Sequence, residues 1–156
     1  MRFNVMLAAL LMGLVATDAL AQTPAPWLGT WKLNVAKSRF NPGPPPTSMT
    51  VTNTAAADGG YEQVTEVVTS SGKAMRFEFY AKPDGKDYPI KGPPNETIWV
   101  KVTDSPDSVW EVKKDGKVIQ RGHTTYGRDG KTRTMTRTTI DGKGQEFESV
   151  LEFDRQ

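Results

Sequence analysis

The segment SVWEVKKDGKVIQRGHTTYGRDGKTRTMTRTTIDGKGQEFESVLEF, residues 108–153, decides the fold class of this protein. It contains three short polar turns, each with an Asp-Gly pair, separated by runs rich in Val, Thr, Tyr, Trp and Phe. Asp and Gly tolerate the backbone angles of tight reversals, and the intervening residue types favour strands. The segment therefore predicts consecutive antiparallel hairpins, with strands near residues 108–114, 117–126, 131–140 and 145–154.

The turn positions also predict which side chains face each other, because register assigns every residue of a strand to one face of the sheet. A two-residue turn at Asp115-Gly116 would pair Val112 with Ile119 and Trp110 with Arg121. The next two turns are expected to pair Tyr126 with Lys131 and Ile140 with Gln145. With this register, apolar residues share one face with a few polar ones: Trp110, Val112, Ile119, Arg121, His123, Thr134, Thr136, Phe147, Leu151 and Phe153. The opposite face collects charged residues, and there Arg133 and Arg137 would meet Glu152 and Glu148.

The earlier part of the chain has the same strand-and-turn character. Further strands are expected near residues 27–35, 48–55, 61–69, 74–81 and 97–103, with a short additional strand at 87–90. About nine to ten strands with one wet face would leave exposed edges unless the sheet closed. We therefore predict an all-β fold, a single antiparallel up-and-down β-barrel with room for a ligand and without a helical lid. A flattened sandwich is the alternative.

The first residues predict export. Met1–Ala21 combine a basic start at Arg2, an apolar run too short to span a bilayer, and the small residues of Ala19-Leu20-Ala21. This is the pattern of a signal peptide, with cleavage expected after Ala21; a buried N-terminal helix is the alternative. Residues 22–26 are expected to be a linker and residues 27–156 the barrel domain, located in the periplasm or secreted.

Composition excludes several function classes. The chain has 156 residues, no Cys, one His and a net charge of +2. The absence of Cys removes disulfides, thiolate metal sites and cysteine nucleophiles, and one His cannot form a multi-histidine metal site. The small net charge gives no electrostatic footprint for nucleic acid, and no nucleotide-binding motif occurs. We expect no metal, no cofactor, no nucleic acid and no stable membrane insertion; the oligomeric state stays open.

Both ends of the domain resemble the calycin superfamily. Gly29-x-Trp31 is similar to the opening of lipocalins, LGTWKL at 28–33 to the start of fatty-acid-binding proteins, and residues 150–155 to their closing strand. A fuller pattern resembles secreted bacterial lipocalin-like proteins: residues 31–34, 37–38, 42–44 and 84–89. The resemblance implies a calycin-type barrel. Fatty-acid-binding proteins place a helix pair after the first strand, which the prolines of residues 41–47 cannot supply. The interior arginines of that family fall on late strands, where Arg121 has a comparable position.

The leading hypothesis is a protein that binds a small apolar or amphipathic molecule in a barrel cavity. Arg121 would anchor an anionic end and His123 would assist. The expected ligand-binding residues are these: Trp31, Phe77, Phe79, Trp110, Arg121, His123, Thr134, Thr136, Phe147 and Phe153. A plainer interpretation makes Arg121 and His123 an interior polar network or places them in solvent at the barrel mouth.

Two other hypotheses remain open. A cofactor-free isomerase, lyase or hydrolase would use His123 as general base, Arg121 to hold negative charge and Glu66 as a carboxylate partner. Glu66 points inward only if Val68 pairs with Met75, and a slip of one residue would place it in water. An envelope interaction protein with a filled interior would instead use Trp99 or the proline loop.

Overall fold

The computed structural model describes residues 25–104 and 106–156, and most of them lie in ten strands. The predicted signal peptide and the start of the linker lie outside the described residues. The elements are β1 (Gly29–Leu33), a 3-10 turn η1 (Val35–Lys37), β2 (Ser48–Ala55), β3 (Tyr61–Val68), β4 (Ala74–Ala81), β5 (Asp84–Lys91), β6 (Glu96–Val102), β7 (Ser108–Lys114), β8 (Lys117–Tyr126), β9 (Thr132–Ile140) and β10 (Glu146–Arg155). Across these described residues no helix has the length and apolar character needed to cross a membrane.

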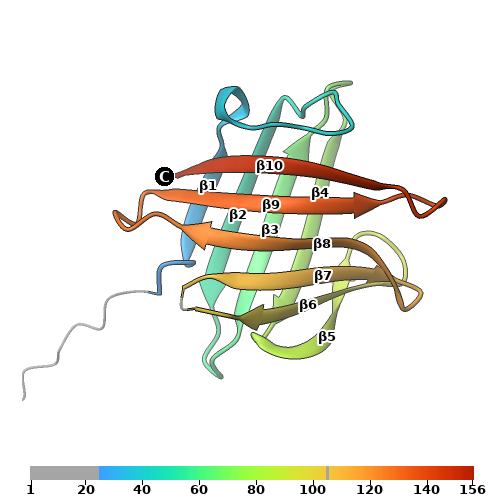
Figure 1. Ribbon diagram of the computed structural model, residues 1–156. Helices are drawn as coiled ribbons and strands as arrows, with labels where there is room; N and C mark the ends of the chain where they lie inside the picture. The colour runs from blue at the N-terminus through green and yellow to red at the C-terminus, as the bar shows by residue number, and fades with distance from the viewer. Residues whose placement is uncertain (1–24, 105) are drawn as a thin grey trace, which may run out of the picture.

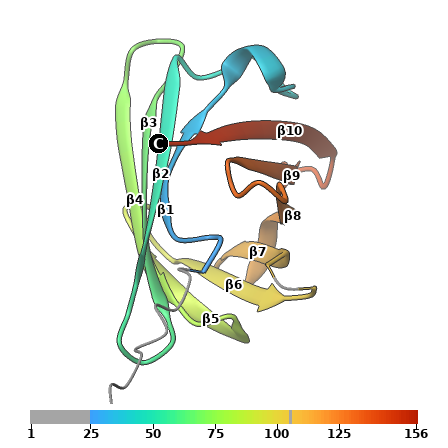
Figure 2. The ribbon, with the colours of Figure 1, turned by 90° about the vertical axis from the view of Figure 1, so that its left-hand side faces the viewer.

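The ten strands form a closed barrel. Each strand is antiparallel to the next along the chain, and β10 pairs with β1 to close the sheet. Figures 1 and 2 show a flattened barrel in which β6–β10 form one layer that crosses the strands of β1–β4 at a steep angle. The predicted up-and-down barrel is confirmed, and the only helical element between β1 and β2 is the single turn η1. Closure pairs the backbone N–H and C=O groups that the edge strands of a sandwich would leave without hydrogen-bond partners.

The predicted register of β7 and β8 was correct at the turn and wrong beyond it. Asp115 and Gly116 both adopt positive φ, as a two-residue hairpin requires, and Lys113 pairs with Val118. A β-bulge then shifts the register, so Val112 pairs with Gln120 rather than with Ile119. A bulge inserts one residue on one strand, and the side chains beyond it change face. The face of β8 that was expected inside the barrel is therefore the outer one.

The turn between β9 and β10 contains a second shift of one residue. Ile140 pairs with Glu146 instead of Gln145, because the turn has three residues and Gly144 adopts a positive φ. This is a common hairpin with glycine at the left-handed position. Between β8 and β9, Tyr126 pairs with Arg133 rather than with Lys131, a shift of two that leaves faces unchanged. Together these shifts turn β8 and β9 over relative to β7 and β10.

One part of the barrel interior is solidly packed. Its largest fully buried side chains are Trp31, Phe153, Leu151 and Val51, which cluster where β1 joins β10 and β2. A second, smaller cluster is centred on Ala81, Ile98 and Val100. Members of both clusters also face the space inside the barrel: Leu151 from the first, and Ile98 and Val100 from the second.

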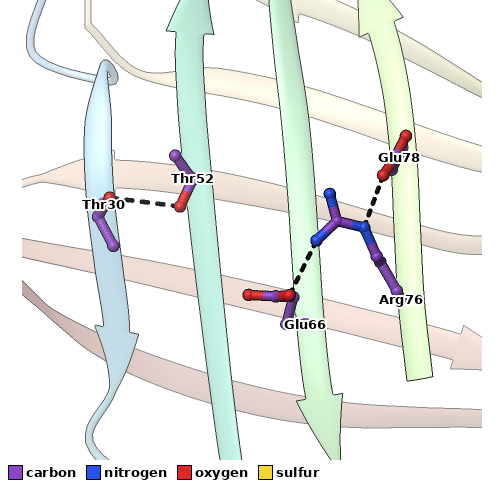
Figure 3. A network of polar contacts seen from close by, with 5 residues as sticks. All are labelled: Thr30, Thr52, Glu66, Arg76 and Glu78. Carbon is purple, nitrogen blue, oxygen red and sulfur yellow. Dashed lines mark hydrogen bonds and ion pairs between the residues drawn. The ribbon is translucent and has the colours of Figure 1, made fainter. Parts of the chain in front are cut away.

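Glu66 lies on the outer face of the barrel. Val67, not Val68, pairs with Met75, so the slipped register is the correct one. Glu66 forms an ion pair of 2.8 Å with Arg76, which also binds Glu78 at 2.6 Å (Figure 3). The side chains of Glu66 and Arg76 are more than half exposed, and exposed pairs of this kind contribute little stability.

Candidate functional site

The two layers of the barrel enclose a cavity of about 480 Å³. Its wall is largely apolar, with Phe77, Phe79, Ile98, Val100, Trp110 and Met135 among the lining residues. Cavities of this size and character hold drug-sized molecules in other proteins. Among the aromatic residues predicted for ligand binding, Phe77, Phe79 and Trp110 line this cavity.

A proline-rich strap, formed by residues 40–47, crosses one end of the cavity. Phe40, Pro44 and Pro46 line the interior space, although most of the strap is exposed. Ser149 of β10 fastens the strap, because its hydroxyl donates to the Asn41 carbonyl at 3.1 Å and accepts from the Asn41 N–H at 3.0 Å. The strap occupies the stretch of chain in which the fatty-acid-binding-protein resemblance would have placed a helix pair.

Trp110 is held against the barrel wall by a glycine on the neighbouring strand. Trp110 pairs with Gly122, and its indole ring covers the position that a side chain at 122 would occupy. The indole Nε1 donates to the Thr124 hydroxyl at 3.1 Å, which fixes the orientation of the ring. The shape of this part of the cavity therefore depends on the missing Cβ of Gly122.

We expect Gly122→Ala to destabilise the protein by about 1–3 kcal/mol and to push the Trp110 ring into the cavity. A Cβ at 122 would overlap the ring and lie 2.5 Å from the backbone oxygen of Thr136, which cannot easily move. Gly142→Ala is the matched control, because a Cβ there meets nothing within 4 Å and its φ is not positive. Urea unfolding checks the difference; equal stability of the two variants would contradict the role of Gly122.

Two arginines of β9, Arg133 and Arg137, line the cavity. Arg133 is 3% exposed, and its Nε and Nη1 have no hydrogen-bond partner among the described residues. The Nε of Arg137 likewise has none. No acidic side chain of the described residues forms an ion pair with either arginine. Arg133 is buried and Arg137 is partly buried. A cation removed from water without a counter-charge is costly, so these two groups are candidate anion-binding positions of the cavity.

The surroundings of Arg133 are aromatic. Its guanidinium carbon lies 5.1 Å from the centroid of the Phe153 ring, and Tyr126 is its pairing partner on β8. Burial lowers the pKa of Arg133 and of Arg137, and burial raises the pKa of Tyr61 and Tyr126. An arginine stays protonated even after such a shift, and both tyrosines stay neutral. This end of the cavity therefore presents positive charge and phenol groups.

Four predicted cavity residues lie on the outer face instead. Arg121 pairs with Glu111 and forms an ion pair of 2.7 Å with Glu146, and His123 is exposed. Thr134 donates to Glu152 at 2.9 Å, and Thr136 pairs with His123. The predicted placement of Arg121, His123, Thr134 and Thr136 inside the barrel was wrong because the bulge in the β7–β8 pairing turned these strands over.

The remaining predicted residues are in the packed part of the interior or beside it. Trp31 and Phe153 are fully buried in the core cluster and are not part of the cavity wall. Phe147 lies on the same face of β10 as Leu151, two pleats away, and is also not part of the wall. Trp31 and Phe153 therefore stabilise the packed core, and none of the three residues lines the cavity.

The sequence interpretation missed Arg133 and Arg137 as cavity residues. A signal was present in the run Thr132–Thr139, where Met135 is the only apolar residue and shares its face with both arginines. The other face of that run contains only threonines, whose hydroxyl groups can be exposed to solvent at little cost. The sequence of β9 by itself therefore favours an inner face formed by Arg133, Met135 and Arg137.

The closed ten-stranded barrel with an interior cavity is a calycin-type fold. Crystal structures of the fluorescent protein UnaG share this fold. A UnaG mutant matches with a TM-score of 0.57 and 16% identity, covering 84% of this chain and 96% of that one. Wild-type UnaG matches with a TM-score of 0.56 and 16% identity, covering 83% and 97%. No family model matches the chain, and no curated protein matches it.

Proposed function

We propose that this protein binds a small amphipathic molecule with an anionic group inside the barrel cavity. The observation that carries the proposal is the unpartnered guanidinium of Arg133, which is 3% exposed and faces the cavity. An anionic group would supply the missing counter-charge through charge-assisted hydrogen bonds. The hydroxyls of Tyr126 and Tyr61, close enough to Arg133 to influence its pKa, would contribute at the same end.

The apolar part of the ligand would lie against the aromatic wall. Phe77, Phe79 and Trp110 present ring surface to the cavity, and Ile98 and Val100 complete that side. Apolar surface removed from water stabilises a complex by roughly 25 cal/mol per Å², while the few polar groups orient the ligand. Residues 40–46 cover one end and would limit the exposure of the bound molecule.

We also propose that binding takes place after export, in the periplasm or outside the cell. This part rests on the sequence of Met1–Ala21 alone, with its basic start, apolar run and small residues before Gln22. Expression of the full chain with its own leader, followed by N-terminal sequencing of the periplasmic protein, tests it. A mature chain that begins at Gln22 supports export, and an intact Met1 in the cytoplasm contradicts it.

Displacement of the fluorescent probe anilinonaphthalenesulfonate by three compounds with the same tail tests the ligand class. Dodecanoate is expected to bind at least about tenfold more tightly than dodecanol, because a hydrogen bond to a charged group contributes about 1.5–3 kcal/mol. Dodecylamine should bind most weakly, since its cation would lie beside an arginine. Equal affinity for dodecanoate and dodecanol would show that the acid group finds no partner and would overturn the proposal.

The two residues that the enzymatic hypothesis needs for acid-base chemistry lie outside the cavity. His123 is exposed on the outer face of β8, and Glu66 is exposed on the outer face of β3. General acid-base catalysis needs such groups within hydrogen-bond reach of a bound substrate. The cavity wall contains neither, so a binding function is the one that these residues favour.

A further inference from the structure

Two separate cationic positions, not one, face the cavity. Arg133 and Arg137 are four residues apart on β9 and share a face, so their Cα atoms are about 13 Å apart in an extended strand. Met135 lies between them and pairs with Leu151, so the wall between the two arginines is apolar. The spacing separates the two charges along the length of the cavity.

The two arginines also have different neighbours. Tyr126 and Phe153 flank Arg133 on the adjacent strands, whereas Gly122 and Ser149 flank Arg137. Tyr126 and Tyr61 influence the pKa of Arg133, while burial alone shifts that of Arg137. The two side chains therefore have different surroundings, and only Arg133 has tyrosines among the groups that act on it.

Within residues 25–104 and 106–156, no carboxylate lies at ion-pair distance from either arginine. Glu96 is the acidic residue of the cavity wall, and its carboxylate lies 3.9 Å from the Lys114 ammonium instead. The Ser149 hydroxyl beside Arg137 is engaged with the Asn41 backbone. A ligand with one acid group would compensate one arginine and leave the other without a counter-charge: either the buried Arg133, or the partly buried Arg137 with its unpartnered Nε.

We infer that the natural ligand is a diacid, with one anionic group at Arg133, the other at Arg137, and an apolar body over Met135. This inference rests on the proposed binding function and specifies its substrate class. It distinguishes the cavity from one built for a molecule with a single acidic head and a free apolar tail. The 480 Å³ of the cavity accommodates such a body within the usual range for small ligands.

Dodecanedioate and dodecanoate form the decisive pair of probes, compared by calorimetry and by probe displacement on the wild-type protein. We expect one dodecanedioate per barrel, bound at least about tenfold more tightly than dodecanoate, because a second charge-assisted contact is made. This comparison needs no variant, so it does not depend on how a mutant folds. Equal affinity for the two acids, or two dodecanoates bound per barrel as tightly as one dodecanedioate, would overturn the inference.

Variants then assign the two positions. Arg133→Met and Arg137→Met should each lower the affinity for dodecanedioate by about tenfold or more, and only one of them should lower that for dodecanoate. Arg121→Met is the matched control, since Arg121 lies outside the cavity in an ion pair with Glu146 and its loss should change neither affinity. Equal losses of dodecanoate affinity in both cavity variants would mean that one acid group uses both arginines, which contradicts the inference. Failure of both acids to bind the wild type would instead contradict the proposed function itself.

Discussion

Replacing Trp31 with alanine is expected to lower the free energy of unfolding by about 3–5 kcal/mol, the range for a large aromatic removed from a packed core. Trp31 is 0% exposed and packs against Leu33, Val51, Leu151 and Phe153. Its ring forms an edge contact of 5.5 Å with Tyr126, and the Arg155 guanidinium lies 4.6 Å from its centroid. Truncation would leave a cavity with rigid strand walls that cannot collapse.

The position of Trp31 at the barrel seam enlarges this effect. β1 is the shortest strand of the barrel, and Trp31 pairs with Arg155 of β10 on one side and Val51 of β2 on the other. The loss would amount to a large part of the 5–15 kcal/mol typical of a whole domain. Closure of the barrel therefore depends on this side chain more than on any pair of surface charges.

Urea unfolding followed by circular dichroism measures the loss. Trp99→Ala is the control of the same residue type, since Trp99 pairs with Glu111 on the outer face and is only partly buried. Its cost should be clearly smaller, because less apolar surface returns to water. A loss below about 1 kcal/mol for Trp31→Ala would mean that the seam is held by backbone pairing alone.

Most of the barrel could be predicted from the sequence because its determinants are local. The Asp-Gly turns and the β-branched runs identify where strands end, and the extra strand expected at 87–90 lies within β5. Strand count and exposed edges then favour closure. Residues 41–47 are too rich in proline for a helical lid, and the strap that they form agrees with this expectation.

The faces of β8 and β9 could not be predicted in the same way. One bulge after Val112 and one three-residue turn ending at Gly144 each change the pairing by one residue. Neither feature has a strong signature in composition, yet each reverses the inner and outer faces of the strands that follow. The error placed Arg121 in the cavity instead of Arg133 and Arg137, so the expected chemistry, an arginine in the cavity, is present at different residues.

The second large effect concerns stability without ligand. Arg133→Met is expected to raise the free energy of unfolding of the empty protein by about 1–3 kcal/mol, because it replaces a buried, unpaired charge with an apolar side chain of similar length. The contact of the Arg133 guanidinium with the Phe153 ring offsets part of the gain, since cation–π contacts contribute about 0.5–2 kcal/mol. Thermal unfolding of protein refolded from denaturant, and thereby freed of bound molecules, measures the change.

The sign of this change separates two roles for Arg133. If the guanidinium holds the barrel together as part of an interior network, its removal lowers the melting temperature of the empty protein. In that case the affinity for dodecanoate or dodecanedioate does not depend on a direct contact with Arg133. If it is kept for a ligand, its removal raises the melting temperature of the empty protein and removes the stabilisation that a bound acid gives the wild type. Arg121→Met removes an exposed ion pair with Glu146. It should change neither the free energy of unfolding of the empty protein nor the stabilisation by a bound acid by more than about 0.5 kcal/mol. A residue whose loss stabilises the fold and weakens binding is retained for binding, because stability alone would favour methionine at that position.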